Sequence, residues 1–170
     1  MKLLSVIVAF AGAVAGFEGL KLQNPFDLEP LQGGEPVPGE SPFTLCDSDV
    51  PRLLDIDYIN IDPNPPEKGK NLTIEAAGML KKQVDEGAFV EVDVRYGYIR
   101  LVNEKFDLCE QIEHVDMECP LEEGPQTIKK VVELPNEVPP GRYLVNARAF
   151  TKDEELITCL SATVDFPYAF

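Results

Sequence analysis

The sequence predicts an all-β fold, with two antiparallel sheets packed face to face as a sandwich. About seven segments alternate apolar and polar residues with the period of two that is typical of strands. The chain also contains 15 Pro and 12 Gly, which is many turn-forming residues for a helical bundle. No segment of about ten residues or more has the apolar spacing of an amphipathic helix. A closed barrel of the lipocalin type is the alternative arrangement of these strands.

The N-terminal segment, residues 1–15, has the pattern of a secretory signal peptide. Lys2 supplies a positive charge, an almost wholly apolar stretch follows, and Ala13-Val14-Ala15 matches a cleavage site. The alternative is a membrane anchor, which would need about 20 apolar residues. Residues 16–38 are rich in Pro and Gly and lack periodicity, so we expect a propeptide or a flexible arm there. The folded domain is then expected over residues 39–170.

The first strand of that domain leads into Cys46, and the second covers residues 54–61. The apolar parity changes after Tyr58, which predicts a β-bulge or a kink near this residue. Four residues, Pro63-Asn64-Pro65-Pro66, end the strand because Pro cannot donate a ladder hydrogen bond. The next strand is expected over residues 72–78. The strand after it, over residues 90–98, places five side chains on one face: Val90, Val92, Val94, Tyr96 and Tyr98.

The C-terminal half predicts three more strands. Residues 124–135 form one of them, and Pro139-Pro140-Gly141 forms a turn. Residues 143–149 alternate again, and the charged segment 151–155 is expected to be a hairpin turn. The last strand is expected over residues 156–166.

The four cysteines are Cys46, Cys109, Cys119 and Cys159, and secretion would favour disulfides over free thiols. Four cysteines allow three pairings. The short loop between Cys109 and Cys119 favours their pairing, which leaves Cys46 and Cys159 to join the first strand to the last. A zinc site is the weaker alternative because no C-x-x-C spacing occurs. Asn71-Leu72-Thr73 is a candidate N-glycosylation site.

The charge and the chemistry of the side chains exclude several functions. The chain has 15 Lys and Arg against 30 Asp and Glu, a formal net charge of −15, so nucleic acid is not an expected partner. The single histidine, His114, excludes catalytic zinc sites that need two. Acidic pairs such as Asp55/Asp57 and Glu91/Asp93 could form a glycosidase dyad, but a solvated sheet face explains them better. We therefore expect no enzyme, no metal and no cofactor.

Several motifs occur in a fixed order along most of the chain. They are Phe43-Thr44-Leu45-Cys46-Asp47, Ile59-Asn60-Ile61-Asp62-Pro63, the loop from Cys109 to Cys119-Pro120, Leu134-Pro135, Pro140-Gly141-x-Tyr143-x-Val145-x-Ala147 and Leu156-Ile157-Thr158-Cys159. In this order and spacing the chain resembles the ML lipid-recognition family. That family includes the fungal phosphatidylglycerol/phosphatidylinositol transfer proteins and the Niemann-Pick type C luminal sterol carrier. Animal members carry a further disulfide where this chain has Pro63–Pro66, and the arm over residues 16–38 resembles the fungal branch.

The resemblance implies an immunoglobulin-like β-sandwich of about seven antiparallel strands with an apolar cavity between the sheets. It also supports the pairs Cys46–Cys159 and Cys109–Cys119. The cavity would hold a single sterol or phospholipid, lined by residues of the inward faces: Ile59, Ile61, Leu72, Ile74, Val92, Val94, Tyr96, Tyr98, Tyr143, Val145, Ala147, Leu160, Ala162 and Val164. Small inward residues would leave room for the lipid: Ala76, Gly78, Ala147, Ala149 and Ala162. The alternative is a tightly packed core built with small residues.

The implied function is transfer of a sterol or phospholipid between membranes, including intracellular sterol transport. The partners would be the lipid, membrane surfaces contacted transiently and a membrane sterol transporter that accepts the lipid, and the protein would be a monomer. The location would be the secretory pathway, either the vacuole or lysosome lumen or outside the cell. The doublets Lys81-Lys82 and Lys129-Lys130 could lie at a membrane-facing rim or be ordinary solvated surface. The alternative function is a secreted adhesion or receptor-binding sandwich with a packed core and no ligand.

Overall fold

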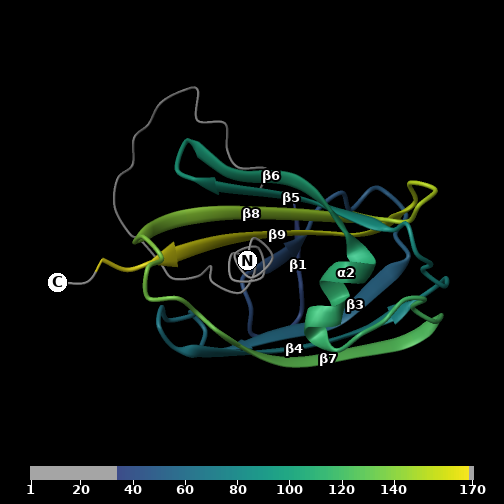
Figure 1. Cartoon of the computed structure of the whole chain (residues 1–170), viewed down its shortest axis with the longest axis horizontal. Coiled ribbons are helices and arrows are strands. Elements are labelled where there is room, and N and C mark those ends of the chain that lie inside the picture. The colour runs from purple at the N-terminus through teal and green to yellow at the C-terminus, as the bar shows by residue number, and fades with distance from the viewer. Residues whose placement is uncertain (1–33, 169–170) are drawn as a thin grey trace.

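A computed structural model describes residues 34–168, and the expected signal peptide and most of the expected arm lie outside them. The described chain forms two antiparallel layers (Figure 1). The larger sheet has six strands in the order β1-β2-β9-β8-β5-β6. Their bounds are Glu35–Pro36, Phe43–Leu45, Leu156–Phe166, Gly141–Phe150, Phe89–Tyr96 and Ile99–Asp107. The smaller sheet has the order β3-β4-β7, with bounds Leu54–Asp62, Asn71–Leu80 and Gly124–Glu133.

The all-β sandwich is confirmed, with nine strands among the described residues where about seven were expected. The strands that the sequence did not reveal are the two-residue β1 and the whole of β6. The expected strand over residues 90–98 was too long, because β5 ends at Tyr96 and Gly97 turns the chain with a φ of 57°. The expected bulge is confirmed, since the β3–β4 register shifts between Ile56 and Tyr58.

The faces of the six-stranded sheet follow from its register. Val92 lies opposite Ala147, and Val94 lies opposite Val145, so these side chains share one face. Ala162 lies opposite both Val145 and Phe43 and extends the same row to β2. Directly opposed residues of antiparallel strands point to the same side of a sheet. This face is directed at the smaller sheet and carries the main apolar core.

One edge of the sandwich is closed by backbone hydrogen bonds. The segment 37–42 connects β1 to β2 and passes beside β3, where the Ile59 N–H donates to the Pro38 carbonyl and the Ile61 N–H to the Glu40 carbonyl, both at 2.9 Å. We call β2, β3 and this segment the closed edge. Val37 is buried here at 4% exposure, so the folded domain begins before the arm was expected to end at residue 38.

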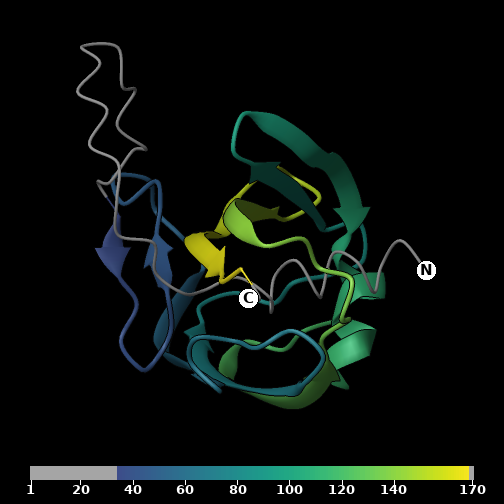
Figure 2. The same cartoon turned by 90° about the vertical axis from the view of Figure 1, so that its left-hand side faces the viewer.

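The opposite edge lies between β6 and β7, which are the last strands of their sheets. Between them the chain forms the helix α2, Leu108–Ile112, and the 3₁₀ turn η1, Glu113–Val115. We call β6, β7 and residues 108–116 the open edge. Figure 2 shows β1 and β2 on one side of the two layers and α2 on the other. The segment between Cys109 and Cys119, expected to be a polar loop, is therefore partly helical.

Both expected disulfides are confirmed, one near each edge. Cys46 is bonded to Cys159 across a sequence separation of 113 residues, and this bond ties β2 to β9 near the closed edge. Cys109 is bonded to Cys119 across a separation of 10 residues and holds the ends of the α2–η1 segment together.

Candidate functional site

The space between the sheets is bordered at the open edge by β7, whose residues alternate regularly between half-buried and exposed. Ile128 lies opposite Ala76, Lys130 opposite Ile74 and Val132 opposite Leu72. Leu72 is fully buried, so this row of β7 points inward, toward the larger sheet. The inward side chains of β7 are nevertheless only half-buried, which distinguishes the open edge from the closed core.

The facing edge strand, β6, also directs residues inward. Val102 lies opposite Val94, Glu104 opposite Val92 and Phe106 opposite Val90. Val102 and Phe106 are half-buried and pack against the main core, while Glu104 is exposed. The inward faces at the open edge therefore combine apolar side chains with two charged ones, Glu104 and Lys130.

Lys129 and Lys130 are consecutive residues that point to opposite faces of the smaller sheet. Lys129 points outward, and its Nζ lies 2.5 Å from Glu75 Oε1. The hydrogen bond and charge of Glu75 raise the pKa of Lys129. Lys130 points inward, and its Nζ lies 3.3 Å from Asp116 Oδ2, at the end of η1. The side chain of Lys130 is 32% exposed, against 73% for Lys129.

The other lysine doublet lies at the far end of the smaller sheet, after β4. Lys81 Nζ is 3.1 Å from Asp55 Oδ1, and Lys82 Nζ is 2.6 Å from Glu155 Oε1. The Glu155 carboxylate raises the pKa of Lys82, chiefly through this hydrogen bond. Both doublets are thus paired with carboxylates, which reduces their value as a basic membrane-facing rim.

Most of the residues expected to line a cavity lie in packed apolar clusters between the sheets. The buried ones are Ile59, Ile61, Leu72, Val92, Val94, Tyr143, Val145, Ala147, Ala162 and Val164, and the half-buried ones are Ile74, Tyr96 and Leu160. Tyr98 does not join them, since it lies beyond β5 and is fully exposed. Whether the others contact a lipid stays a prediction.

The small inward residues have different surroundings. Ala147, Ala149 and Ala162 are buried in packed clusters, whereas Ala76 is only half-buried. A Cβ on Gly78 would lie 2.6 Å from the Asp55 carbonyl oxygen, so glycine allows β3 and β4 to approach each other. Ala76 is therefore the small residue best placed to leave room near the open edge.

An aromatic cluster closes one end of the six-stranded sheet. The rings of Tyr96 and Tyr143 are 5.0 Å apart, and Phe166 meets Tyr143 edge-on at 5.7 Å. The Tyr143 hydroxyl donates to the Pro139 carbonyl at 2.7 Å. Burial raises the pKa of Tyr143, with a smaller contribution from Tyr96. These contacts hold the rings of Tyr96 and Tyr143 in place at this end of the sheet.

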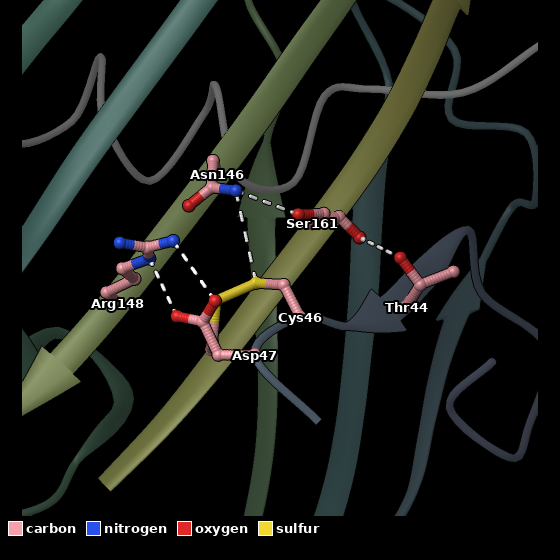
Figure 3. Close-up of a disulfide and its surroundings, with 7 residues drawn as sticks. Thr44, Cys46, Asp47, Asn146, Arg148 and Ser161 are labelled. Carbon is pink, nitrogen blue, oxygen red and sulfur yellow. Dashed lines mark hydrogen bonds and ion pairs between the residues drawn. A yellow bond between two sulfur atoms is a disulfide. The ribbon is translucent and has the colours of Figure 1, made fainter. Parts of the chain in front are cut away.

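The outer face of the six-stranded sheet bears a concave surface of about 740 Å³. It is lined by polar side chains such as Asp93, Asn146 and Arg148. Figure 3 shows part of this face beside the Cys46–Cys159 disulfide, where Arg148 pairs with Asp47 and Asn146 donates to Ser161 Oγ at 2.9 Å. Such a lining does not suit hydrocarbon, because a bound lipid tail would remove these exposed polar groups from water.

A model of the ML domain matches residues 40–166. The chain belongs to the ML family. A phosphatidylglycerol/phosphatidylinositol transfer protein of Yarrowia lipolytica is 52% identical over 167 residues, covering 98% of this chain and 85% of the relative. A protein of the same name from Candida albicans is 48% identical over 166 residues, covering 98% of this chain and 83% of the relative.

Two solved structures share the fold. Chicken MD-1 complexed with lipid IVa has a TM-score of 0.53 at 18% identity, covering 74% of this chain and 88% of MD-1. A Niemann-Pick type C2 protein from the Japanese carpenter ant has a TM-score of 0.50 at 17% identity, covering 74% of this chain and 98% of the ant protein. The β-sandwich is the fold that this chain shares with both structures.

The family and its relatives are lipid-transfer and lipid-binding proteins rather than enzymes, as the sequence predicted. The two disulfides, together with the family, indicate a lumenal or extracellular protein. Between Gly34 and Tyr168, no helix has the length and apolar character needed to cross a membrane.

Sequence reasoning missed the open-edge residues Phe106, Ile128 and Lys130 as candidates for ligand contact. The alternation in residues 124–133 was a usable signal, because Lys130 has the same parity as Ile128 and Val132. For β6 the alternation of apolar and polar residues was obscured. The inward row contains the charged Glu104, and the apolar Leu101 is 52% exposed.

Proposed function

We propose that this chain is a carrier that holds one phospholipid between its two sheets and transfers it between membranes. The observation that carries the proposal is the open edge, where apolar side chains of both sheets point inward and yet are only half-buried. A site that exchanges a lipid needs apolar surface that the protein does not cover completely. The acyl chains would enter beside Ile128, Val132 and Phe106.

The driving force would be the burial of hydrocarbon. At about 25 cal/mol per Å², hiding roughly 300 Å² of lipid gains about 7 kcal/mol before the entropic costs of binding. The names of the relatives at 52% and 48% identity support phosphatidylglycerol or phosphatidylinositol as the ligand. A sterol is the competing ligand that the experiment below must distinguish.

Transfer also requires brief contact with a membrane, and the turn between β5 and β6 offers a surface for it. Tyr98, Ile99 and Leu101 are 106%, 60% and 52% exposed. Tyrosine and aliphatic side chains favour the interface between headgroups and acyl chains. Because the turn leads directly into β6 of the open edge, contact there would bring the half-buried inward row close to the bilayer. The lumen of the vacuole is the compartment we propose for this activity.

The first experiment identifies the ligand by mass spectrometry of lipid extracted from the purified protein. It then measures the transfer of labelled phosphatidylglycerol, phosphatidylinositol and sterol between liposomes. Stoichiometric phospholipid and catalysed transfer support the proposal. A bound sterol without phospholipid transfer would show that the ligand is a sterol and not a phospholipid. A protein that takes up none of the three lipids would instead be a packed adhesion or receptor-binding sandwich.

A second experiment tests the membrane-contacting turn. The variant Tyr98→Ser/Ile99→Ser/Leu101→Ser is expected to transfer lipid several-fold more slowly while its thermal stability is unchanged. The matched control is Val50→Ser/Met79→Ser, which removes exposed apolar side chains from surfaces outside the open edge, where these side chains are 46% and 45% exposed. Equal slowing by both variants would show that the turn has no special role.

A further inference from the structure

The inward-pointing Lys130 is a cation in a row of apolar residues, and the carrier mechanism described above does not use it. We propose that Lys130 and Asp116 form a headgroup site for a phospholipid whose phosphodiester carries a polyol. Lys130 Nζ would donate to a phosphate oxygen, and the Asp116 carboxylate would accept hydrogen bonds from the polyol hydroxyls. This inference rests on the proposed carrier function and assigns the part of the ligand that stays at the open edge.

The position of Lys130 is the first argument. Its register partner is Ile74, and its neighbours in the inward row of β7 are Ile128 and Val132. An acyl chain lying along this row would leave its phosphate close to the one inward lysine of β7. Lysine binds phosphate as a strongly hydrated point charge and needs no rigid geometry.

The present partner of Lys130 can be exchanged, which is the second argument. Asp116 Oδ2 lies 3.3 Å from Nζ, and the Asp116 side chain is 76% exposed, whereas that of Lys130 is 32% exposed. Exposed ion pairs of this kind are weak. The ammonium group has three donors, so a phosphate oxygen can bind beside Asp116 or replace it.

The surrounding charge is the third argument, and it favours a polyol over a bare phosphate. The carboxylate that contacts Lys130 is Asp116, and Glu113 begins the same 3₁₀ turn. Carboxylates repel a free anion but accept hydrogen bonds from hydroxyl groups. Glycerol and inositol headgroups supply such hydroxyls next to a single phosphodiester charge, so they match one lysine that is paired with a carboxylate.

The test compares two adjacent lysines that undergo the same loss of charge. Full-length Lys130→Gln is expected to bind phosphatidylglycerol and phosphatidylinositol at least about tenfold more weakly, as for the loss of a hydrogen bond between charged groups. Its binding of diacylglycerol with the same acyl chains is expected to stay unchanged. Lys129→Gln, which removes the outward lysine, is expected to leave the binding of all three lipids unchanged.

Two further variants separate the headgroup role from a structural one. Lys130→Arg keeps the cation and is expected to retain binding of both anionic lipids. Asp116→Asn is expected to weaken phosphatidylinositol binding several-fold without weakening the binding of phosphatidylmethanol, a phosphodiester whose headgroup has no hydroxyl groups. Because Asp116 is mostly exposed, this second variant is expected to fold even if Lys130→Gln does not.

Several outcomes would overturn the headgroup site while leaving the carrier function intact. One is that Lys130→Gln binds the anionic lipids as tightly as the unaltered protein does. Another is that Lys130→Gln loses as much affinity for diacylglycerol as for the anionic lipids. Displacement of bound phosphatidylinositol by millimolar inorganic phosphate would also overturn it, because the site would then hold a free anion. If the unaltered protein binds none of these lipids, the proposed function itself fails.

Discussion

The two long edges of this sandwich are joined in different ways. At the closed edge, backbone N–H groups of Ile59 and Ile61 donate to carbonyls of the crossing segment, and both side chains are 6% exposed. At the open edge, β7 meets η1 through the side-chain pair Lys130–Asp116, and the inward residues stay half-buried. Backbone pairing and complete burial make one edge rigid, while the other is held by contacts that are easier to break.

The largest difference between the edges should come from their disulfides. Replacing Cys46 and Cys159 with alanine releases a loop closed over 113 residues, which costs about 5 kcal/mol of unfolding free energy by the chain-entropy relation. Replacing Cys109 and Cys119 with alanine releases a shorter loop, closed over a sequence separation of 10 residues, and this costs about 2.7 kcal/mol of unfolding free energy. Urea unfolding of the two double variants measures both. A greater loss for the Cys109/Cys119 variant would reverse the assignment of the rigid edge.

Truncating one isoleucine at each edge should sharpen the comparison. Ile59→Ala empties a buried position at the closed edge and should cost about 3 kcal/mol of unfolding free energy. Ile128→Ala removes a half-buried side chain at the open edge and should cost about 1 kcal/mol, because less apolar surface returns to water. Denaturant midpoints give both values. If the two costs were equal, the open edge would be packed as tightly as the closed one.

The smallest effect concerns Tyr143, in the same core cluster as Phe43 of the closed edge. Tyr143→Phe removes the hydrogen bond to the Pro139 carbonyl and should cost about 1 kcal/mol at pH 7. Since burial raises the pKa of Tyr143, the unfolded chain releases this proton first, so the stability of the protein should fall as the pH rises above about 10.

That dependence can be measured by thermal melts between pH 8 and 11. Tyr143→Phe should flatten the alkaline decline, because the residue can no longer ionise. The exposed Tyr98 is the control, and Tyr98→Phe should leave the curve unchanged. If the stability of Tyr143→Phe declines at alkaline pH as much as that of the unaltered protein, the decline is caused by another ionisable group.

The fold was predictable where apolar and polar residues alternate with a period of two along a whole segment. The alternation in residues 90–96 and 143–149 set the inward faces of β5 and β8, and the parity change after Tyr58 located the bulge. The disulfide pairs were predictable because the cysteines bracket either a short loop or nearly the whole domain. β6 was not predictable, because an exposed edge strand tolerates Glu104 inside and Leu101 outside.

The site was less predictable than the fold. Sequence reasoning selected apolar residues that a carrier and a packed core share, and the structure places most of them, such as Val94 and Ala147, in the buried clusters. The features that distinguish a binding edge depend on which strands end each sheet. The doublet Lys129-Lys130 shows the limit. Parity places Lys130 on the face of Ile128 and Val132, but the register of β7 with the buried Leu72 is needed to show that this face points inward.

The order of the strands also constrains how the molecule can be made. β2 is near the start of the described chain but lies between β1 and β9, and β9 is the last of the described strands to be synthesised. Until β9 is complete, Phe43 and Leu45 lack the residues Ala162 and Leu160 that lie opposite them in the sheet. The rigid side of the sandwich can therefore be completed only after β6 and β7 of the open edge have been synthesised.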